Sequence, residues 1–369
     1  MIQEYMVVIV MNNKITCQQV IDRLNENNIS YTIKQFGNCA IIVSKHGGRI
    51  FGPFENKESE SLSWMSQSFR NSESYKEMIE TRAWNIGGER FWIAPELAFF
   101  VKERKRFDDT YIVQDAMGFG SYELKENDTE ITISQTAQLD VYEMPFDYKK
   151  IFMRRTIIKA INPFSESKTN KFPDNTIYCG YHQTFYIKDE TPQNSMYVEP
   201  WILNQINPGG KLLVPYFGQL DFVDYYYPID ENCQQVHNGY VELNITGKRK
   251  FKIAYKAINT FGRSAYVNRL DDGRYYAHFR SYNNNPSNKY CCEPADKPGE
   301  KGCSLFVYND FEDGHGGFGE YENSGLTLGM DTGLTESRCE LTTWWFIGAK
   351  ESIEQIVHTL LGVKYSISI

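Results

Sequence analysis

Short runs with a two-residue hydrophobic period, separated by turn-forming residues, fill most of the chain from about residue 97 onward. Residues 130–134 and 240–245 alternate cleanly, which is typical of strands with one buried and one wet face. Many strands and few helices favour a sandwich or a barrel built around one main core. Further strands are predicted at residues 154–161, 176–187, 251–257 and 274–280, with turn formers such as Asn207-Pro208-Gly209-Gly210 between strands.

Three helices are predicted. The first begins at a capping box, in which the Thr16 hydroxyl and the Gln19 amide satisfy each other's backbone N–H groups. A polar helix is expected at residues 58–69. The C-terminal helix is the clearest, because Gly362 can end it in the left-handed conformation after an apolar stripe. That stripe consists of Ile353, Ile356, Val357, Leu360 and Leu361.

The N-terminal region differs from the rest in mixing a helix with strands. After the first helix, two strands at residues 31–36 and 39–44 are predicted, joined by a tight turn at Gly37-Asn38. We therefore expect a small α/β appendage or edge at residues 1–45, followed by the main domain at residues 46–369, with the boundary near the Gly47-Gly48 pair.

Charge and motifs exclude several classes of partner. The chain has 39 basic and 47 acidic residues, a net charge of −8, with no long basic stripe for nucleic acid. Residues 6–11 form an apolar run that lacks the flanks of a signal peptide, and no stretch approaches the ~20 apolar residues of a membrane span. We therefore expect a cytoplasmic protein. No phosphate-binding glycine motif is present, so no cofactor is predicted.

Cysteines are scattered rather than arranged as a disulfide framework, so most are expected to be reduced thiols. Cys291, Cys292 and Cys303 are the exception, because three thiols in one Pro/Gly/Lys-rich loop could bind a metal or form a disulfide. Their spacing does not match paired zinc knuckles, and no metal is predicted.

Three segments, in order along the chain, resemble a known family. Residues 86–96 carry Gly-Gly-Glu-Arg-Phe-Trp-Ile-Ala-Pro-Glu, and residues 199–210 place a Trp before a Pro/Gly turn. Residues 308–310 and 318–322 carry Tyr-Asn-Asp and Glu-Tyr-Glu, ahead of a Trp-containing strand at 343–347. These segments are similar to those of uncharacterised galactose mutarotase-like proteins. The resemblance implies an all-β, antiparallel two-sheet β-supersandwich with a carbohydrate site on its concave face, as in aldose 1-epimerases.

In mutarotases of this type, a His protonates the ring oxygen and a carboxylate removes the proton of the anomeric hydroxyl. The resemblance suggests His182 as the acid, although Tyr181 stands where the family carries an Asn. Glu320 or Glu322 would be the carboxylate, and the two lie on the same face of a strand because they are two residues apart. The structural alternatives are a histidine whose ring nitrogens are hydrogen-bonded within the fold, and two glutamates exposed to water on the outer face of a strand.

Further residues are candidates for substrate binding. Arg90 and Glu96 flank a Gly-rich bend, where they could grip sugar hydroxyls or form a structural ion pair. Trp201, near Asn204, could stack on a sugar. Asn309 belongs to the Tyr-Asn-Asp segment, and His315 lies in an acidic, Gly-rich loop at residues 310–317 that fails the EF-hand pattern for Ca²⁺.

Two functions are predicted as alternatives. One is a carbohydrate-active enzyme, either an epimerase of free sugars or a related lyase or hydrolase, that uses His182 with Glu320 or Glu322. The other is a noncatalytic sugar-binding or sensing module. A third interpretation, ranked last, makes the Tyr225-Tyr226-Tyr227 run a protein interface. The expected partner is a small carbohydrate; its identity, the anomeric preference and the oligomeric state are left open.

Overall fold

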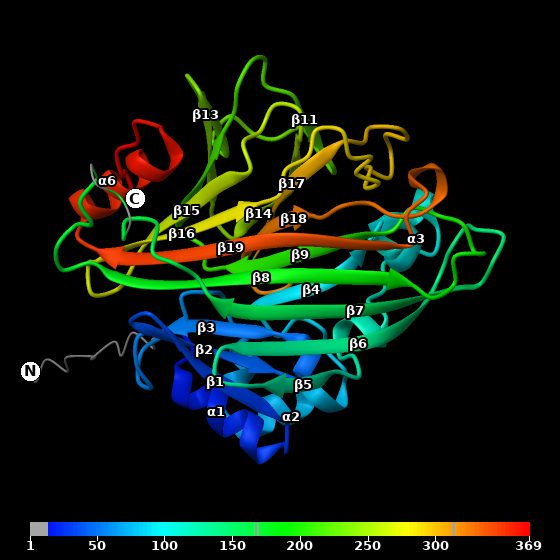
Figure 1. Cartoon of the computed structure of the whole chain (residues 1–369), viewed down its shortest axis with the longest axis horizontal. Coiled ribbons are helices and arrows are strands. Elements are labelled where there is room, and N and C mark those ends of the chain that lie inside the picture. The colour runs from blue at the N-terminus through cyan, green and yellow to red at the C-terminus, as the bar shows by residue number, and fades with distance from the viewer. Residues whose placement is uncertain (1–13, 166, 168–169, 312–313) are drawn as a thin grey trace, which may run out of the picture.

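The computed structural model describes residues 14–165, 167, 170–311 and 314–369. These residues form two large sheets, one of nine and one of ten strands, in which every paired strand is antiparallel to its neighbour (Figure 1). The predicted all-β, two-sheet architecture is therefore confirmed. The apolar run at residues 6–11 lies outside the described residues.

The nine-stranded sheet joins segments that are far apart in the sequence, because β4 pairs with β9 and β9 pairs with β18. Its order is β1 (Tyr31–Phe36), β2 (Cys39–Ser44), β3 (Ile50–Phe54), β4 (Glu89–Ala94), β9 (Glu199–Ile206), β18 (Gly319–Ser324), β17 (Cys303–Phe311), β14 (Lys248–Lys256) and β11 (Phe222–Asp224).

The ten-stranded sheet contains the longest strands. Its order is β12 (Gln234–His237), β13 (Tyr240–Ile245), β10 (Gly210–Pro215), β15 (Arg263–Arg269), β16 (Tyr275–Tyr282), β19 (Glu336–Gly348), β8 (Ile177–Asp189), β7 (Tyr148–Lys159), β6 (Glu130–Asp140) and β5 (Glu123–Glu126).

The main core lies between the two sheets. It forms because side chains alternate along each strand, so that every second residue points toward the other sheet. In β8, odd-numbered residues from Cys179 to Ile187 point into this core, whereas residues such as His182 point to the opposite face. Across the interface, the rings of Phe91 on β4 and Phe185 on β8 meet edge to face, with centroids 5.0 Å apart. Each sheet thus has an inner face in this core and an outer face.

The helices only partly match the prediction. α1 (Cys17–Glu26) begins with the Thr16 and Gln19 capping box, and α6 (Lys350–Leu361) ends at Gly362 with φ 71°, as expected. The helix predicted at residues 58–69 is wrong: α2 (Ser72–Glu80) follows it instead. Residues 61–65 are buried and extended, and Ser63 and Met65 form bridges to Ile206 and Gly87. Short helices are α3 (Glu96–Phe100), α4 (Phe107–Thr110) and α5 (Asp115–Gly118).

The N-terminal elements form one end of the nine-stranded sheet. β1 and β2 are paired as predicted, and β2 continues the sheet into β3. α1 and α2 share a separate apolar cluster with that end of the sheet. The domain boundary at residues 45 and 46 stays a prediction. In the part of the chain that is described, no helix is long and apolar enough to cross a membrane.

Candidate functional site

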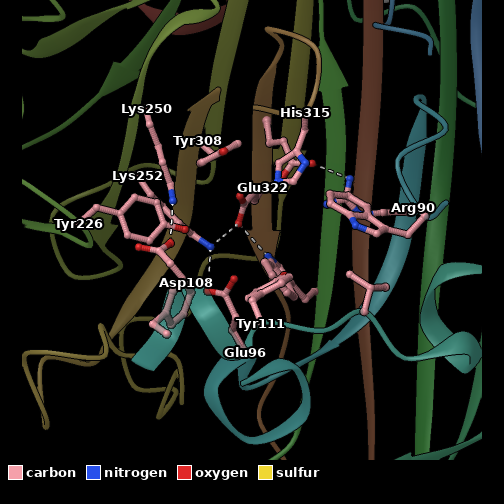
Figure 2. Close-up of a pocket in the computed structure, with 15 residues that line it drawn as sticks. Arg90, Glu96, Asp108, Tyr111, Tyr226, Lys250, Lys252, Tyr308, His315 and Glu322 are labelled. Atoms are coloured by element: carbon pink, nitrogen blue, oxygen red, sulfur yellow. Dashed lines mark hydrogen bonds and ion pairs between the residues drawn. The ribbon is translucent and has the colours of Figure 1, made fainter. Parts of the chain in front are cut away.

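A pocket of about 250 Å³ lies against the outer face of the nine-stranded sheet. This volume is below the roughly 300–1,000 Å³ of drug-sized sites, and it suits one small molecule. Strands form its floor, and the segment from α3 to residue 113 forms one wall (Figure 2). The lining residues are Trp84, Arg90, Glu96, Phe107, Asp108, Tyr111, Val113, Trp201, Tyr226, Lys250, Lys252, Tyr308, His315, Glu320 and Glu322.

Strand register brings the charged floor together. Leu203 of β9 pairs with Arg90 on one side and with Glu322 on the other, so these side chains stand in one row. Glu320, two residues before Glu322, shares its face and pairs with Tyr308. Tyr308 in turn pairs with Lys252. Two neighbouring rows across five strands therefore carry the ionisable groups of the pocket floor.

Arg90 is held at one side of the pocket floor. Its Nη1 lies 2.6 Å from Glu320 Oε1, and both side chains are almost completely buried. The guanidinium also lies over the Trp92 ring, 4.2 Å from the centroid, and faces Trp84 at 5.5 Å. Trp92 itself is fixed by donation from its indole N–H to the Met117 carbonyl, so the cation is seated on a rigid aromatic support.

Lys252 occupies the opposite side of the floor. Its Nζ lies 3.1 Å from Glu96 Oε2 and 3.6 Å from Glu322 Oε2, and it stands over the Trp201 ring at 4.9 Å. The Trp201 indole N–H donates to Glu322 Oε2 at 2.8 Å. Figure 2 shows the Glu322 carboxyl between Lys252 and the side of the pocket that carries His315. The Lys252 ion pair and the Trp201 indole thus fix the same oxygen of Glu322, Oε2.

Glu322 has the properties of a group that exchanges protons near neutral pH. Burial raises its pKa to about 7, and the nearby Glu320 adds to the rise, while Lys252 opposes it. Conversely, burial lowers the pKa of Lys252, but attraction to Glu322 and Glu96 outweighs this and leaves the pKa above its ordinary value. The second oxygen, Glu322 Oε1, is buried and has no hydrogen-bond partner among the described residues.

The pocket mouth carries an ion pair that is partly exposed to solvent. Lys250 Nζ pairs with Asp108 Oδ1 at 2.8 Å and lies over the Tyr226 ring at 4.7 Å. The Asp108 side chain is 68% exposed, so this pair is accessible to solvent and contributes little to stability. The mouth can therefore adapt to a ligand, whereas the floor is fixed.

His315 lines the pocket from the loop before β18. Its backbone N–H donates to Asp310 Oδ2 at 2.7 Å, and its carbonyl accepts from the Asn85 amide at 2.6 Å. Its ring lies edge-on to Trp84, with centroids 5.4 Å apart. Asp310 also accepts from the Gly317 N–H and so shapes the loop that was considered for Ca²⁺. Residues 312–313 of that loop lie outside the described residues.

The fold brings together six of the nine predicted site residues: Arg90, Glu96, Trp201, His315, Glu320 and Glu322. Arg90 and Glu96 both line the pocket, but they do not form the ion pair that was considered for them. Arg90 pairs with Glu320, and Glu96 pairs with Lys252.

His182 is not brought to this pocket. It lies on the outer face of the ten-stranded sheet, where its Nδ1 is 2.9 Å from the Thr342 hydroxyl and its Nε2 is 3.9 Å from Glu340 Oε2. A full sheet and the main core separate this face from the pocket. The predicted pairing of His182 with Glu320 or Glu322 therefore does not occur in this structure.

Asn204 and Asn309 do not line the pocket either. Asn204 lies 3.3 Å from the Ser63 hydroxyl and is buried. Asn309 accepts from the Gly247 N–H and donates to the Arg249 carbonyl, which fixes the turn between β13 and β14. All eight cysteines are free thiols, Cys291, Cys292 and Cys303 included. Among the described residues, no group of three or more His, Cys, Asp or Glu side chains could hold a metal ion.

Several lining residues were missed by the sequence analysis. The strongest omission is Lys252, together with Lys250 two residues earlier on β14. The local pattern, a lysine alternating with Phe251 and Ile253 inside a predicted strand, indicates only that Lys252 lies on the face opposite to those two residues. A lysine in such a position must find a partner when buried. Tyr226, considered only as a possible protein interface, also lines the pocket.

Fold and pocket together define a two-sheet, all-β protein with a charged, tryptophan-lined cavity on the outer face of one sheet. The model of a protein family of unknown function, DUF6786, matches residues 17–367. The chain belongs to this family. No curated protein matches it.

Two solved structures similar to this chain are described as "putative aldose 1-epimerase". The Escherichia coli K12 protein is 9% identical, with a TM-score of 0.49 over 86% of this chain and 99% of its own. The Klebsiella pneumoniae protein is 7% identical, with a TM-score of 0.42 over 88% and 81%. At such identities neither substrate nor chemistry follows for this chain.

Proposed function

We propose that the pocket binds a small neutral sugar and catalyses interconversion of its anomers, with Glu322 as the group that exchanges the proton of the anomeric hydroxyl. The observation that carries this proposal is the Glu322 carboxyl, buried on the pocket floor with its pKa raised to about 7 and one oxygen without a partner. A general base is most efficient when its pKa is near the working pH.

The surrounding groups suit a sugar. The aromatic rings of Trp201 and Trp84 line the pocket, while Arg90 and Lys252 offer donors next to carboxylates that accept from hydroxyls. In the proposed step, Glu322 takes the proton of the C1 hydroxyl while the C1–O5 bond breaks, and O5 receives a proton from His315. The open-chain aldehyde then closes on either face, with both protons returned.

A second candidate function, a noncatalytic sugar-binding module, is favoured by a specific observation. The carboxylates of the pocket are each paired with a cation: Glu320 with Arg90, Asp108 with Lys250, Glu96 with Lys252, and Glu322 with the same Lys252 at 3.6 Å. Such pairing stabilises a binding surface, and catalysis would depend on Glu322 and His315.

The test is anomer exchange, measured by polarimetry and by NMR saturation transfer, on D-glucose, D-galactose and D-mannose. Wild-type protein should accelerate exchange for at least one of these sugars. Glu322→Gln should lower the catalysed rate by about 10²–10⁴-fold, which is the usual contribution of a general acid or base. His182→Ala is the matched control and should leave the rate unchanged, because His182 lies on the other sheet.

The outcomes separate the two candidates. A sugar that raises the melting temperature without faster anomer exchange supports the binding module, because binding to the folded state stabilises it by mass action. If none of the sugars is bound or converted at millimolar concentration, the proposed function is wrong. A rate that falls with His182→Ala but not with Glu322→Gln would assign the chemistry to the other sheet.

A further inference from the structure

A second and larger cavity, of about 550 Å³, adjoins the pocket. Glu96, Phe107, Asp108 and Tyr226 line both cavities and so form the partition between them. The remaining lining residues of this outer cavity are Arg104, Lys105, Arg106, Asp109, Tyr225, Tyr227, Glu293, Ala295 and Asp296.

Two weak interactions lie at the partition between the cavities. Lys250 Nζ and Asp108 Oδ1 are 2.8 Å apart, and the centroids of the Phe107 and Tyr226 rings are 5.9 Å apart. The Lys250 and Asp108 side chains are 30% and 68% exposed, so water competes for both and their separation costs little. Sugar hydroxyls can replace each partner, since one group donates and the other accepts.

The far wall of the outer cavity is rigid. The Arg104 guanidinium donates to Glu293 Oε1 at 2.6 Å, to the Pro294 carbonyl at 2.8 Å and to the Ala295 carbonyl at 2.7 Å. Lys301 Nζ also approaches Glu293, at 3.4 Å. Two chain segments about 190 residues apart are thereby joined to each other in this wall.

Charge and aromatic content define the class of ligand. The outer cavity has three basic residues, Arg104, Lys105 and Arg106, against five acidic ones, Glu96, Asp108, Asp109, Glu293 and Asp296. An anionic group such as a phosphate or uronate carboxylate is disfavoured by this excess of acid. Tyr227 is 64% exposed and presents an aromatic surface beside these polar groups, a combination that suits a neutral sugar unit.

We propose that the two cavities form one extended site for a neutral oligosaccharide, with the reducing-end unit beside Glu322 and the next unit in the outer cavity against Tyr227. This inference rests on the proposed function of the inner pocket. It specifies the substrate class of that site: a reducing disaccharide or longer chain is bound in preference to its own reducing-end monosaccharide.

The experiment is isothermal titration calorimetry with matched pairs of probes. D-glucose is compared with maltose, cellobiose and lactose, D-galactose with β-1,4-galactobiose, and D-mannose with β-1,4-mannobiose. At least one disaccharide should bind about tenfold or more tightly than its monosaccharide, which corresponds to one well-packed additional contact surface. Tyr227→Ala and Lys105→Ala should each reduce this advantage several-fold and leave the monosaccharide Kd unchanged. Tyr148→Ala, an exposed tyrosine on β7, is the control.

The results distinguish a failure of the extended site from a failure of the proposed function on which it rests. Monosaccharide binding with no disaccharide advantage, or an advantage that survives both outer-cavity variants, overturns the extended site and leaves the proposed function standing. Binding of neither class overturns both. Melting temperatures of the variants, which change only exposed side chains, establish that a lost advantage does not come from unfolding.

Discussion

Glu89 and Arg90 are consecutive residues of β4, yet they belong to two different buried charge clusters on opposite faces of one sheet. Glu89 points into the core between the sheets, where it contacts Arg155 and lies 3.6 Å from Arg280. Arg90 points to the outer face, where it pairs with Glu320 in the pocket. The side chains of both charge clusters are at most about a tenth exposed.

The two clusters differ in sign and in access. Between the sheets cations are in excess, and burial lowers the pKa of Arg155 to about 9 and that of Arg280 to about 10. In the pocket acids are in excess, and burial raises the pKa of Glu322 to about 7. Of these two clusters, the one in the pocket borders a cavity that a ligand could enter. Buried charge alone therefore does not mark a functional site; buried charge next to a cavity does.

The largest expected effect is on the core cluster. Glu89→Gln should lower the free energy of unfolding by about 3–5 kcal/mol, because it leaves two arginines buried without their carboxylate. Urea unfolding measures this change. The control, Glu80→Gln, breaks an exposed pair with Lys76 and should change stability by less than about 0.5 kcal/mol. A loss below about 1 kcal/mol for Glu89→Gln would remove the contrast between the clusters.

In the pocket cluster, the same Glu→Gln substitution should raise the free energy of unfolding at neutral pH rather than lower it. Since the pKa of Glu322 is about 7 in the folded state and ordinarily 4.5, the unfolded chain loses this proton first as pH rises. The wild-type free energy of unfolding therefore falls as pH rises from about 4.5 to about 7, because Glu322 must ionise in a buried site. Above pH 7 this loss of stability is complete. Glu322→Gln escapes this cost, so its stability relative to wild type should increase between pH 5 and 8, by on the order of 2 kcal/mol. Equal differences at both pH values would contradict the assignment.

The smallest effect is expected where charges are exposed. Asp108→Asn removes the partner of Lys250 at the pocket mouth and should change the free energy of unfolding by less than about 1 kcal/mol. Adding salt should reduce even this difference, since exposed pairs are screened. A larger, salt-independent loss would mean that the mouth is as rigid as the floor.

Much of the fold could be predicted because it depends on local patterns. Residues 240–245 alternate, and they form β13; the capping box at Thr16 begins α1; and Gly362 ends α6. The helix predicted at residues 58–69 failed because polar residues there do not signal a helix when tertiary bridges hold the chain extended.

The site was predictable only in part, because its assembly depends on register and on which sheet each strand joins. The two-residue spacing of Glu320 and Glu322 is local information, and both line the pocket. The position of His182 depends on the partners of β8, which no local pattern specifies, and it lies on the other sheet. Lys252 pairs with Glu96 across 156 positions of sequence, beyond the reach of any short motif.

The crossed strand order of the nine-stranded sheet has a consequence for how the protein acquires its pocket. Trp92 pairs with Trp201, and Leu203 pairs with Glu322, so the floor closes only after contacts across more than a hundred residues have formed. Topologies dominated by such long-range pairing fold slowly, and the entropy of loop closure is lost before the contacts repay it. A nascent chain that has not yet supplied β18 cannot contain the site. Ligand binding in the pocket would therefore report completion of the nine-stranded sheet.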